Sequence, residues 1–289
     1  MTNPLVSLCI PTYNRAEFIE ETVNCALNQT YNNIEVIVSD NCSTDNTIAI
    51  LEKINTPKLQ VYCNKENLGP VRNWQAVFEK AKGEYFLMLF SDDIIKPNYV
   101  EEAIKLFDND TGFVMSDHAI IEDGQIIYTK AHTYSSISTS KYLEDIVLLN
   151  INEYPFTPIC AIFRKNDLEG HIYDKLPNTD NIDFNRTGAG PDLLFYLIVA
   201  FKYKKINFIQ KTLVITRAHN TSISIIESRR TGLKLSYDWG RLFFLQNFYP
   251  ILLNKYKSLT YLRLFLYKNT YVNLYKEMNT TKIDLFFLT

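Results

Sequence analysis

One buried strand that ends in two adjacent carboxylates constrains this chain more than any other feature. Residues 85–90 are six apolar or aromatic residues without a break, and Ser91, Asp92 and Asp93 follow directly. Such a run predicts a strand covered on both faces, as in the middle of a parallel sheet. Neighbouring carboxylates repel each other, so the pair indicates a divalent cation, Mg²⁺ or Mn²⁺, or ligand hydroxyls. A polar loop whose aspartate caps the next helix remains a plainer alternative.

Strand and helix patterns alternate through the first hundred residues. This alternation predicts an α/β fold with a mainly parallel sheet and right-handed crossovers. Strands are predicted at 5–10, 34–39, 59–63 and 85–90, and helices at 16–29, 44–53 and 70–82.

The pattern loosens after residue 98. We predict helices at 99–109, 141–149, 193–201, 228–248 and 255–278, strands at 112–116, 159–164 and 212–216, a hairpin arm at 125–128 and a polar loop at 135–140.

The loops that follow the parallel strands carry polar residues suited to a nucleotide. Ligands of open α/β sheets bind at the carboxyl ends of the strands, where these loops converge. We expect Tyr13 to stack on a base, Asp40 to accept from a base N–H or a ribose hydroxyl, and Arg72 to meet a phosphate. Asp92 and Asp93 would take the ribose and the metal. Each of these residues alone also fits an ordinary surface loop.

Two common nucleotide motifs are missing from the sequence. No GxGxxG follows the first strand, and Gly188-Ala189-Gly190 lacks the third glycine, which argues against a dinucleotide-binding Rossmann domain. No GxxxxGK[ST] occurs, which excludes P-loop chemistry.

A set of short motifs resembles the family 2 inverting glycosyltransferases of the GT-A fold. The motifs are P-T-Y-N-R at 11–15, N-Q-T-Y at 28–31, E-V-I-V-S-D-N-C-S-T-D-N-T at 35–47, N-L-G at 67–69, A-K-G-E-Y at 81–85 and S-D-D at 91–93. The resemblance implies a nucleotide-sugar donor, a divalent cation at an Asp-x-Asp-type motif, and transfer by single displacement. Serine replaces the first acid of that motif here, which leaves Asp93 as the main metal ligand.

The resemblance also implies which residues contact the donor, with UDP as the expected nucleotide. Asp93 and His219 are the expected metal ligands. The expected donor contacts are Pro11, Tyr13, Arg15, Asp40, Asn41, Asn67, Gly69, Arg72, Ser91, Asp92, Arg217 and Ser222.

Asp192 is the predicted catalytic base. Gly188 to Pro191 predict a turn, and Asp192 opens a strongly apolar helix whose N-terminus favours an ionised carboxylate. One such base suffices for direct attack by a sugar hydroxyl. By resemblance, this Gly-Pro-Asp takes the place of the family's catalytic acidic motif, although proline stands where a second acid is usual. An aspartate that only caps the helix is the alternative.

Arg217 and His219 alternate on one face of an extended segment, and both suit a diphosphate or its metal. Several family members carry a similar R-x-H-x-x-S stretch that closes over the donor diphosphate, and here this stretch ends at Ser222.

The last part of the chain differs in charge from the rest. From Ile226 onward there are ten Lys and Arg against four Asp and Glu, although the whole chain has a net charge of −2. The segment fits a helix pair packed on the catalytic domain, a homodimer contact, or a peripheral membrane anchor for a lipid-linked acceptor. Nucleic acid is not an expected partner, because the acidic body offers no continuous basic groove.

Five unpaired cysteines, no signal peptide and no apolar run of membrane-spanning length favour a cytoplasmic protein that is at most peripheral on the inner membrane face. We predict a GT-A catalytic domain at 1–225, divided into a nucleotide half (1–110) and an acceptor half (111–225), and a helical segment at 226–289.

The predicted function is metal-dependent, inverting transfer of a sugar to a hydroxyl of a glycan or lipid-linked glycan in bacterial surface polysaccharide synthesis, as in a capsule or lipopolysaccharide. Two rivals stay open. One is a non-catalytic scaffold that binds a nucleotide sugar or glycan. The other is a sugar-phosphate nucleotidyltransferase, for which residues 11–15 lack the expected basic glycine-rich loop.

Overall fold

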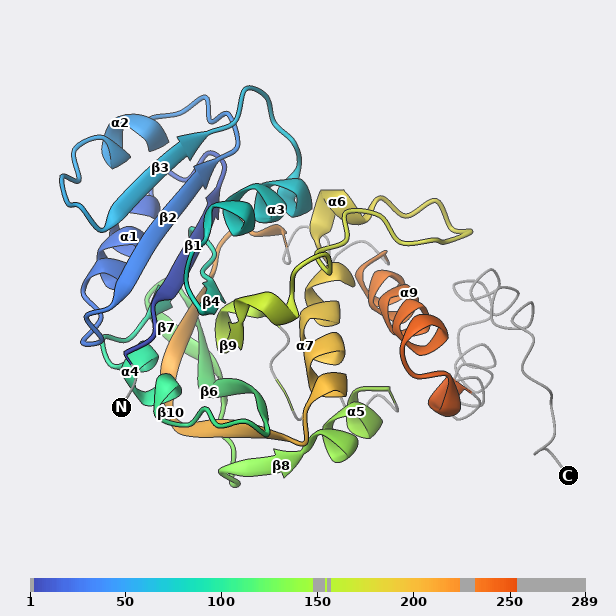
Figure 1. The fold of residues 1–289 in the computed structure, drawn as a ribbon. Coiled ribbons are helices and arrows are strands. Elements are labelled where there is room, and N and C mark those ends of the chain that lie inside the picture. The colour runs from blue at the N-terminus through green and yellow to red at the C-terminus, as the bar shows by residue number, and fades with distance from the viewer. Residues whose placement is uncertain (1–2, 148–153, 155–156, 224–231, 254–289) are drawn as a thin grey trace, which may run out of the picture.

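The computed structural model describes residues 3–147, 154, 157–223 and 232–253, and these form a mixed sheet flanked by helices (Figure 1). The strands are β1 (Val6–Thr12), β2 (Ile34–Asp40), β3 (Leu59–Cys63), β4 (Tyr85–Met88), β5 (Ile94–Ile95), β6 (Thr111–Glu122), β7 (Gln125–Lys130), β8 (Ser136–Ser138), β9 (Ala161–Arg164) and β10 (Lys205–Ala218). The helices are α1 (Ile19–Leu27), α2 (Thr47–Leu51), α3 (Pro70–Lys80), α4 (Tyr99–Ile104), α5 (Thr139–Val147), α6 (Phe184–Thr187), α7 (Pro191–Lys202) and α9 (Gly232–Asn247).

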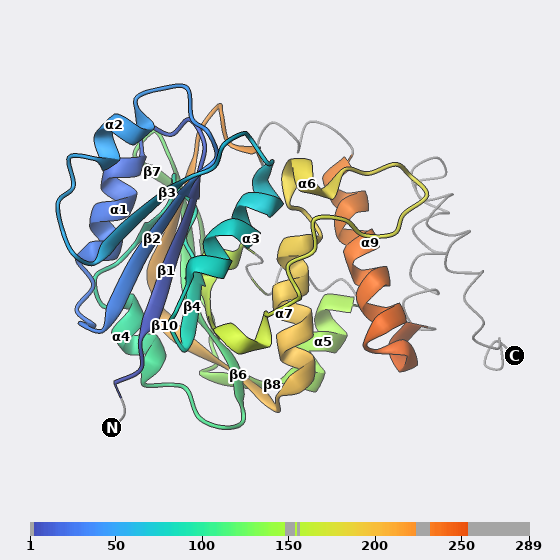
Figure 2. The same ribbon diagram turned by 45° about the horizontal axis from the view of Figure 1, so that its top comes forward.

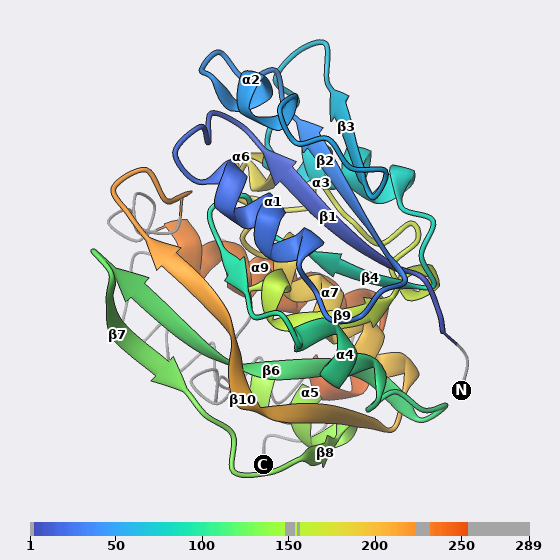
Figure 3. The ribbon, with the colours of Figure 1, turned by 90° about the vertical axis from the view of Figure 1, so that its left-hand side faces the viewer.

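The first half of the sheet is parallel, as predicted. Its strands follow the order β3-β2-β1-β4, so the chain winds outward to β3 and then crosses back to β4. Helices α1 and α2 lie on one face of these strands and α3 on the other (Figure 3). Because β1 and β2 are buried along their whole length, their apolar runs reflect cover on both faces.

The second half of the sheet mixes strand directions. β6 and β10 are long parallel neighbours, while β9 pairs with β4 and β6 in antiparallel fashion and joins the two halves. β7, β8 and β5 add antiparallel edges. The longest ladders are parallel, so the predicted mixed, mainly parallel α/β sheet is confirmed.

Several local predictions were wrong in detail. The predicted polar loop at 135–140 contains strand β8 and the start of α5, because β8 pairs with the beginning of β10 and the Thr139 hydroxyl donates to the Tyr203 carbonyl. β6 and β10 extend well beyond 112–116 and 212–216. β4 ends at Met88, and Phe90 turns into a pocket.

Helix α7 is the central helix of the second half. It is apolar on all sides and buried from its first turn to Ala200, as expected for a helix with neighbours all round. The Tyr196 ring packs edge-on against Phe113 and Phe163, with ring centroids 5.2 and 5.3 Å apart. Helices α5 and α9 both pack against α7 (Figure 2).

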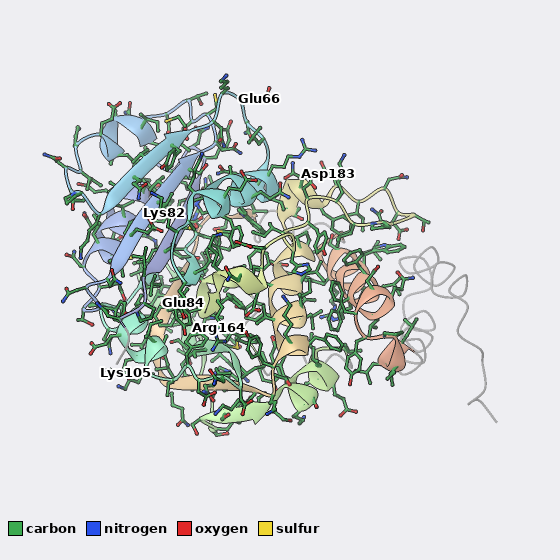
Figure 4. The ribbon with its side chains drawn as sticks, viewed as in Figure 1. Glu66, Lys82, Glu84, Lys105, Arg164 and Asp183 are labelled. Carbon is green, nitrogen blue, oxygen red and sulfur yellow. The ribbon has the colours of Figure 1, made fainter. Side chains whose placement is uncertain are left out.

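Arg164, at the end of β9, ties several segments together (Figure 4). Its guanidinium lies over the rings of Tyr203, Phe107 and Tyr85, at 4.9, 5.1 and 5.9 Å from their centroids. It also donates to the carbonyl of Asp108 at 2.7 Å. These contacts hold the junction of the two halves at the side away from the carboxyl ends of β1 and β2.

The predicted helix at 228–248 is present as α9, whose described residues begin at Gly232. The predicted helix at 255–278 lies outside the described residues, so its packing, dimer and membrane interpretations stay predictions. Among the residues that are described, no helix is both long and apolar enough to cross a membrane. The proposed domain division at 225/226 also stays a prediction.

Candidate active site

A pocket of about 660 Å³ lies at the carboxyl ends of β1 and β4 and reaches the N-terminus of α7. This is where the α/β topology places ligand sites. The predicted site residues that line it are Pro11, Tyr13, Arg15, Asn41, Asn67, Ser91, Asp92, Asp93, Asp192, Arg217 and Ser222. Those that do not line it are Asp40, Gly69, Arg72 and His219.

Asp40 and Gly69 support the loops at one end of the pocket. The buried Asp40 carboxylate accepts from the Ser43 amide at 2.8 Å and from its hydroxyl, which fixes the loop after β2. The Asn41 side chain donates to Asn67 Oδ1 at 2.8 Å and to the Gly69 carbonyl at 3.3 Å. These contacts make one rigid wall from the loops after β2 and β3.

Arg72 does not line the pocket and pairs with Asp174 instead. Its guanidinium Nε lies 2.8 Å from the Asp174 carboxylate, and the side chain is largely exposed on α3. A phosphate contact from Arg72 would therefore need this ion pair to open.

Two neighbouring side chains balance the negative charge of Asp92. Its Oδ2 lies 3.0 Å from His219 Nε2 and 3.4 Å from Arg15 Nε. Burial on its own would raise the pKa of Asp92, but the hydrogen bond from His219 and the charge of Arg15 outweigh it and hold the pKa below its ordinary value. Asp92 is thus ionised at neutral pH and joins the loops after β1, β4 and β10.

Asp93 has a different environment. Its Oδ1 accepts from the backbone amide of Arg217 at 3.0 Å, and its side chain is almost completely buried. Burial and the adjacent Asp92 carboxylate raise the pKa of Asp93 well above its ordinary value, against the opposing amide and charge of Arg217. Among the described residues, the ion pairs of this carboxylate pair involve Asp92 rather than Asp93. An added cation would offset the negative charge at Asp93.

The donor set fits a Mg²⁺ or Mn²⁺ ion held partly by a substrate. No group of three or more His, Cys, Asp or Glu side chains in the described part of the chain could hold a metal alone. Mg²⁺ is usually bound by one or two carboxylates together with substrate phosphates, which matches a pair such as Asp92 and Asp93. Both ring nitrogens of His219 face protein groups, Asp92 and the Thr221 hydroxyl, so metal ligation by His219 would replace one of these contacts.

The end of β10 and the segment after it close one side of the pocket. The Arg217 guanidinium lies over the Phe18 ring at 4.9 Å and pairs with Glu21 on α1. The Ser222 hydroxyl accepts from the His219 amide at 3.2 Å. Arg217 and Ser222 both line the pocket. The contact between Ser222 and the His219 amide also holds the turn that positions His219.

Asp192 is the buried carboxyl group on the α7 side of the pocket. Its Oδ1 accepts from the amides of Gly190 and Leu193 at 2.9 and 2.7 Å, and its Oδ2 accepts from the Tyr237 hydroxyl at 3.0 Å. Burial nevertheless raises the pKa of Asp192 to about 7, against these three hydrogen bonds. The sequence predicts that the helix N-terminus favours the ionised form, but the effect of burial on the pKa is larger.

The sequence interpretation missed the residues that complete the pocket from the second half of the chain. His118 on β6 lies 2.7 Å from the Thr216 hydroxyl on β10, and both residues line the pocket. Tyr128 on β7 and Tyr237 on α9 line it as well. No local signal marks these residues, since each belongs to an ordinary strand or helix pattern and reaches the pocket only through tertiary packing.

A sequence model of the family described as "Glycosyl transferase family 2" matches residues 7–171. One relative is TuaG of Bacillus subtilis (strain 168), a glycosyltransferase assigned to teichuronic acid biosynthesis. It is 32% identical over 155 residues, which cover 51% of this chain and 61% of TuaG.

Two solved structures share the fold. TarS 1-349 of S. aureus in complex with UDP-GlcNAc has a TM-score of 0.61 at 22% identity, covering 76% of this chain and 60% of that one. The mannosyltransferase PcManGT of Pyrobaculum calidifontis, in complex with GDP-Man and Mn²⁺, has a TM-score of 0.53 at 17% identity, covering 97% and 83%. The chain thus spans about 60% of the length of TuaG and of the TarS 1-349 fragment. The structural likeness confirms the predicted GT-A fold.

Proposed function

The chain belongs to glycosyl transferase family 2, and on this basis we propose that it transfers a sugar, with inversion, from a nucleotide-sugar donor to an acceptor hydroxyl. One observation carries the proposal. A single pocket holds an adjacent carboxylate pair after β4 and a separate buried carboxyl group at the start of α7, whose pKa is about 7.

In the proposed step, Asp192 Oδ2 takes the proton of the acceptor hydroxyl as that oxygen bonds to the anomeric carbon. The bond from this carbon to the phosphate oxygen breaks, and the leaving nucleoside diphosphate keeps the electron pair. A base works best when its pKa is close to the working pH, and a pKa of about 7 meets this condition. One base and one displacement give inversion.

Asp93, assisted by Asp92 or His219, is the proposed holder of Mn²⁺ or Mg²⁺. When bound, the cation would offset the charge that grows on the leaving diphosphate. The raised pKa of Asp93 supports this assignment, because a buried carboxylate beside another carboxylate is stabilised by a cation. Arg15 and Arg217 bring further positive charge to the same side of the pocket.

The donor and acceptor classes are proposed from the similar proteins. UDP is the proposed nucleotide, since the structure of TarS 1-349 holds UDP-GlcNAc, whereas that of PcManGT holds GDP-Man. The assignment of TuaG to teichuronic acid biosynthesis supports a glycan or lipid-linked glycan of the bacterial surface as acceptor.

The test is a panel of UDP-, GDP-, dTDP- and CMP-sugars with Mn²⁺, scored by acceptor-dependent release of the nucleotide. Thermal shifts with the free nucleotides run in parallel, because a ligand that binds only the folded state raises its stability. We expect one nucleotide to stabilise the wild type in the presence of metal and its sugar to be consumed. Stabilisation without any release would favour the non-catalytic scaffold, and diphosphate formation from a sugar phosphate would favour the nucleotidyltransferase.

A further inference from the structure

Tyr237 contacts the oxygen of Asp192 that the proposed reaction uses. Its hydroxyl donates to Oδ2 at 3.0 Å, whereas the backbone amides of Gly190 and Leu193 donate to Oδ1. Tyr237 also lines the same pocket, although it lies on α9, 45 residues further along the chain. A helix from the last third of the protein thus reaches the proposed base.

The direction of this hydrogen bond follows from the environment of the phenol. Burial, followed by the charge of Asp192, raises the pKa of Tyr237 well above its ordinary value. The phenol therefore keeps its proton and donates it. An O–H donor stabilises a carboxylate more than a carboxylic acid, so this contact opposes the effect of burial on Asp192.

Two glycines let α9 approach closely enough for this contact. A Cβ on Gly240 would lie 3.0 Å from the Cα of Gly190, and a Cβ on Gly190 would lie 2.7 Å from the Ser236 carbonyl. Gly190 also has a φ of +95°, which side chains disfavour. Ser236 and Gly240 are one helical turn apart and lie on either side of Tyr237 in sequence, so the glycine contact fixes the part of α9 that carries the phenol.

Further contacts anchor α9 around this crossing. Trp239 Nε1 donates to Asp180 at 2.7 Å, and Arg241 Nε donates to the Ile146 carbonyl at 3.0 Å. Figures 1 and 2 both show α9 beside α7. The phenol is therefore held in place from several sides.

We propose that Tyr237 is a positioning residue for the transfer reaction: its hydroxyl orients the Asp192 carboxylate and tunes how readily Oδ2 accepts the acceptor's proton. The inference rests on the proposed function, in which Asp192 is the base. Tyr237 itself exchanges no proton with the substrate in this scheme.

Other ionisable groups that share the pocket or the surroundings of Tyr237 must stay unchanged in the test, so that any shift in titration is due to Tyr237 alone. They come from several elements: Tyr196 on α7, Arg241 and its partner Asp238 on α9, Asp92 and Asp93 after β4, Arg15 after β1, His118 on β6 and Arg217 on β10.

The test compares Tyr237→Phe with Tyr203→Phe in the full-length protein. Tyr203 is a matched control, because its hydroxyl also donates to a carboxylate, Asp167 Oδ2 at 2.8 Å, but outside the pocket. For Tyr237→Phe we expect the acid limb of kcat/KM against pH to move up by about one to two pH units, as for a hydrogen bond to a charged group. The rate loss should be largest below pH 7 and shrink at alkaline pH. Tyr203→Phe should keep the wild-type profile.

A second measurement needs no turnover. Unfolding free energy is followed against pH for wild type, Tyr237→Phe, Asp192→Asn and the double variant. If Tyr237 acts on Asp192, the Tyr237→Phe change should extend the pH range in which stability falls to higher pH, and Asp192→Asn should abolish that extension.

The outcomes separate the two claims. Unchanged pH dependence of both rate and stability in Tyr237→Phe overturns the role of Tyr237, whatever the enzyme transfers. If the stability curve of Tyr237→Phe is shifted relative to wild type but the wild type transfers no sugar, the effect of Tyr237 on Asp192 is supported and the proposed function is overturned. A uniform rate loss at every pH, with no shift of either curve, shows a structural role only and also overturns the inference.

Discussion

The Nε2 atom of His219 lies 3.0 Å from Oδ2 of Asp92, and the two residues are 127 positions apart in the sequence. Arg15 approaches the same oxygen from the loop after β1. The contact joins the turn after β10 to the loop after β4, directly beside the proposed metal ligand Asp93.

Replacement of His219 by Gln should weaken metal-dependent nucleotide binding. Gln is neutral and lacks the imidazole whose hydrogen bond and charge hold the Asp92 carboxylate, and changes to groups that orient metal-site carboxylates weaken metal affinity by about 10- to 100-fold. Calorimetric titration of UDP with and without Mn²⁺ measures the change. His171→Gln is the control, since His171 contacts Tyr173 at 3.0 Å and does not line the pocket. Equal affinities in wild type and His219→Gln would contradict the role assigned to this contact.

Asp93→Asn should abolish the stabilisation by nucleotide plus Mn²⁺ while leaving the free protein at least as stable as wild type. The Arg217 amide donates to Asp93 Oδ1 at 3.0 Å, and the Asn side chain keeps an oxygen that can accept this hydrogen bond. The substitution also removes a buried charge. Thermal shift with and without EDTA reports both effects. Asp110→Asn, which breaks an exposed ion pair with Lys204, should respond to metal and nucleotide as wild type does. A metal-dependent shift that persists in Asp93→Asn would remove Asp93 from the metal site.

Asp192→Asn should retain nucleotide binding and lose transfer by about 10²- to 10⁴-fold, the contribution typical of a general base. The free energy of unfolding of this variant should also lose the contribution that depends on the titration of Asp192. The folded-state pKa of about 7 exceeds the ordinary value of 3.8, so the folded protein binds more protons than the unfolded chain between these values. Stability therefore falls as the pH rises through this range in wild type.

Denaturant unfolding from pH 4 to pH 9 checks this prediction. The Asn variant should show a flatter curve and should gain stability relative to wild type above pH 7. Near-normal turnover in Asp192→Asn would exclude Asp192 as the base, and an unchanged curve would show that Asp192 titrates normally.

Gly240→Ala should impair activity although it adds a better helix former. In an open helix this change stabilises by up to about 1 kcal/mol. Here the new Cβ lies 3.0 Å from Gly190 Cα, so α9 must move and Tyr237 with it. We expect a lower melting temperature and a reduced kcat. Gly112→Ala is the control, because its Cβ would meet Tyr203 at an ordinary 3.4 Å, away from the pocket. Full activity in Gly240→Ala would show that the close crossing is not needed.

The sequence predicts the first half of this fold better than the second. β1 and β2 are mostly apolar runs, β3 is a short strand beside them, and helices separate all three; their loops meet because parallel strands share one edge. Asp92, Asp93 and Asp192 also carry local signals, namely adjacent charges after an apolar run and a Gly-Pro-Asp helix start.

The parts that escaped prediction depend on contacts between distant segments. β8 is three residues long and exists because β10 offers an edge to pair with. Tyr237 has no neighbour in sequence that marks it, and the raised pKa of Asp192 comes from burial beneath elements far along the chain. Local sequence patterns give no information on the contact of Tyr237 or on the burial of Asp192.

The parallel pairing of β6 and β10 has a consequence for how the protein folds. His118 and Thr216 meet across this ladder although they are 98 residues apart, whereas Ser7 and Glu35 in the first half are 28 apart. Closing a longer loop costs more chain entropy, so distant pairing slows folding. In pulse-labelled refolding, the amides of β1 and β2 should gain protection before those of β10. The first half of the sheet would then be built early, and Asp192, on the helix that leads into β10, would reach its place only as the last strand closes the sheet.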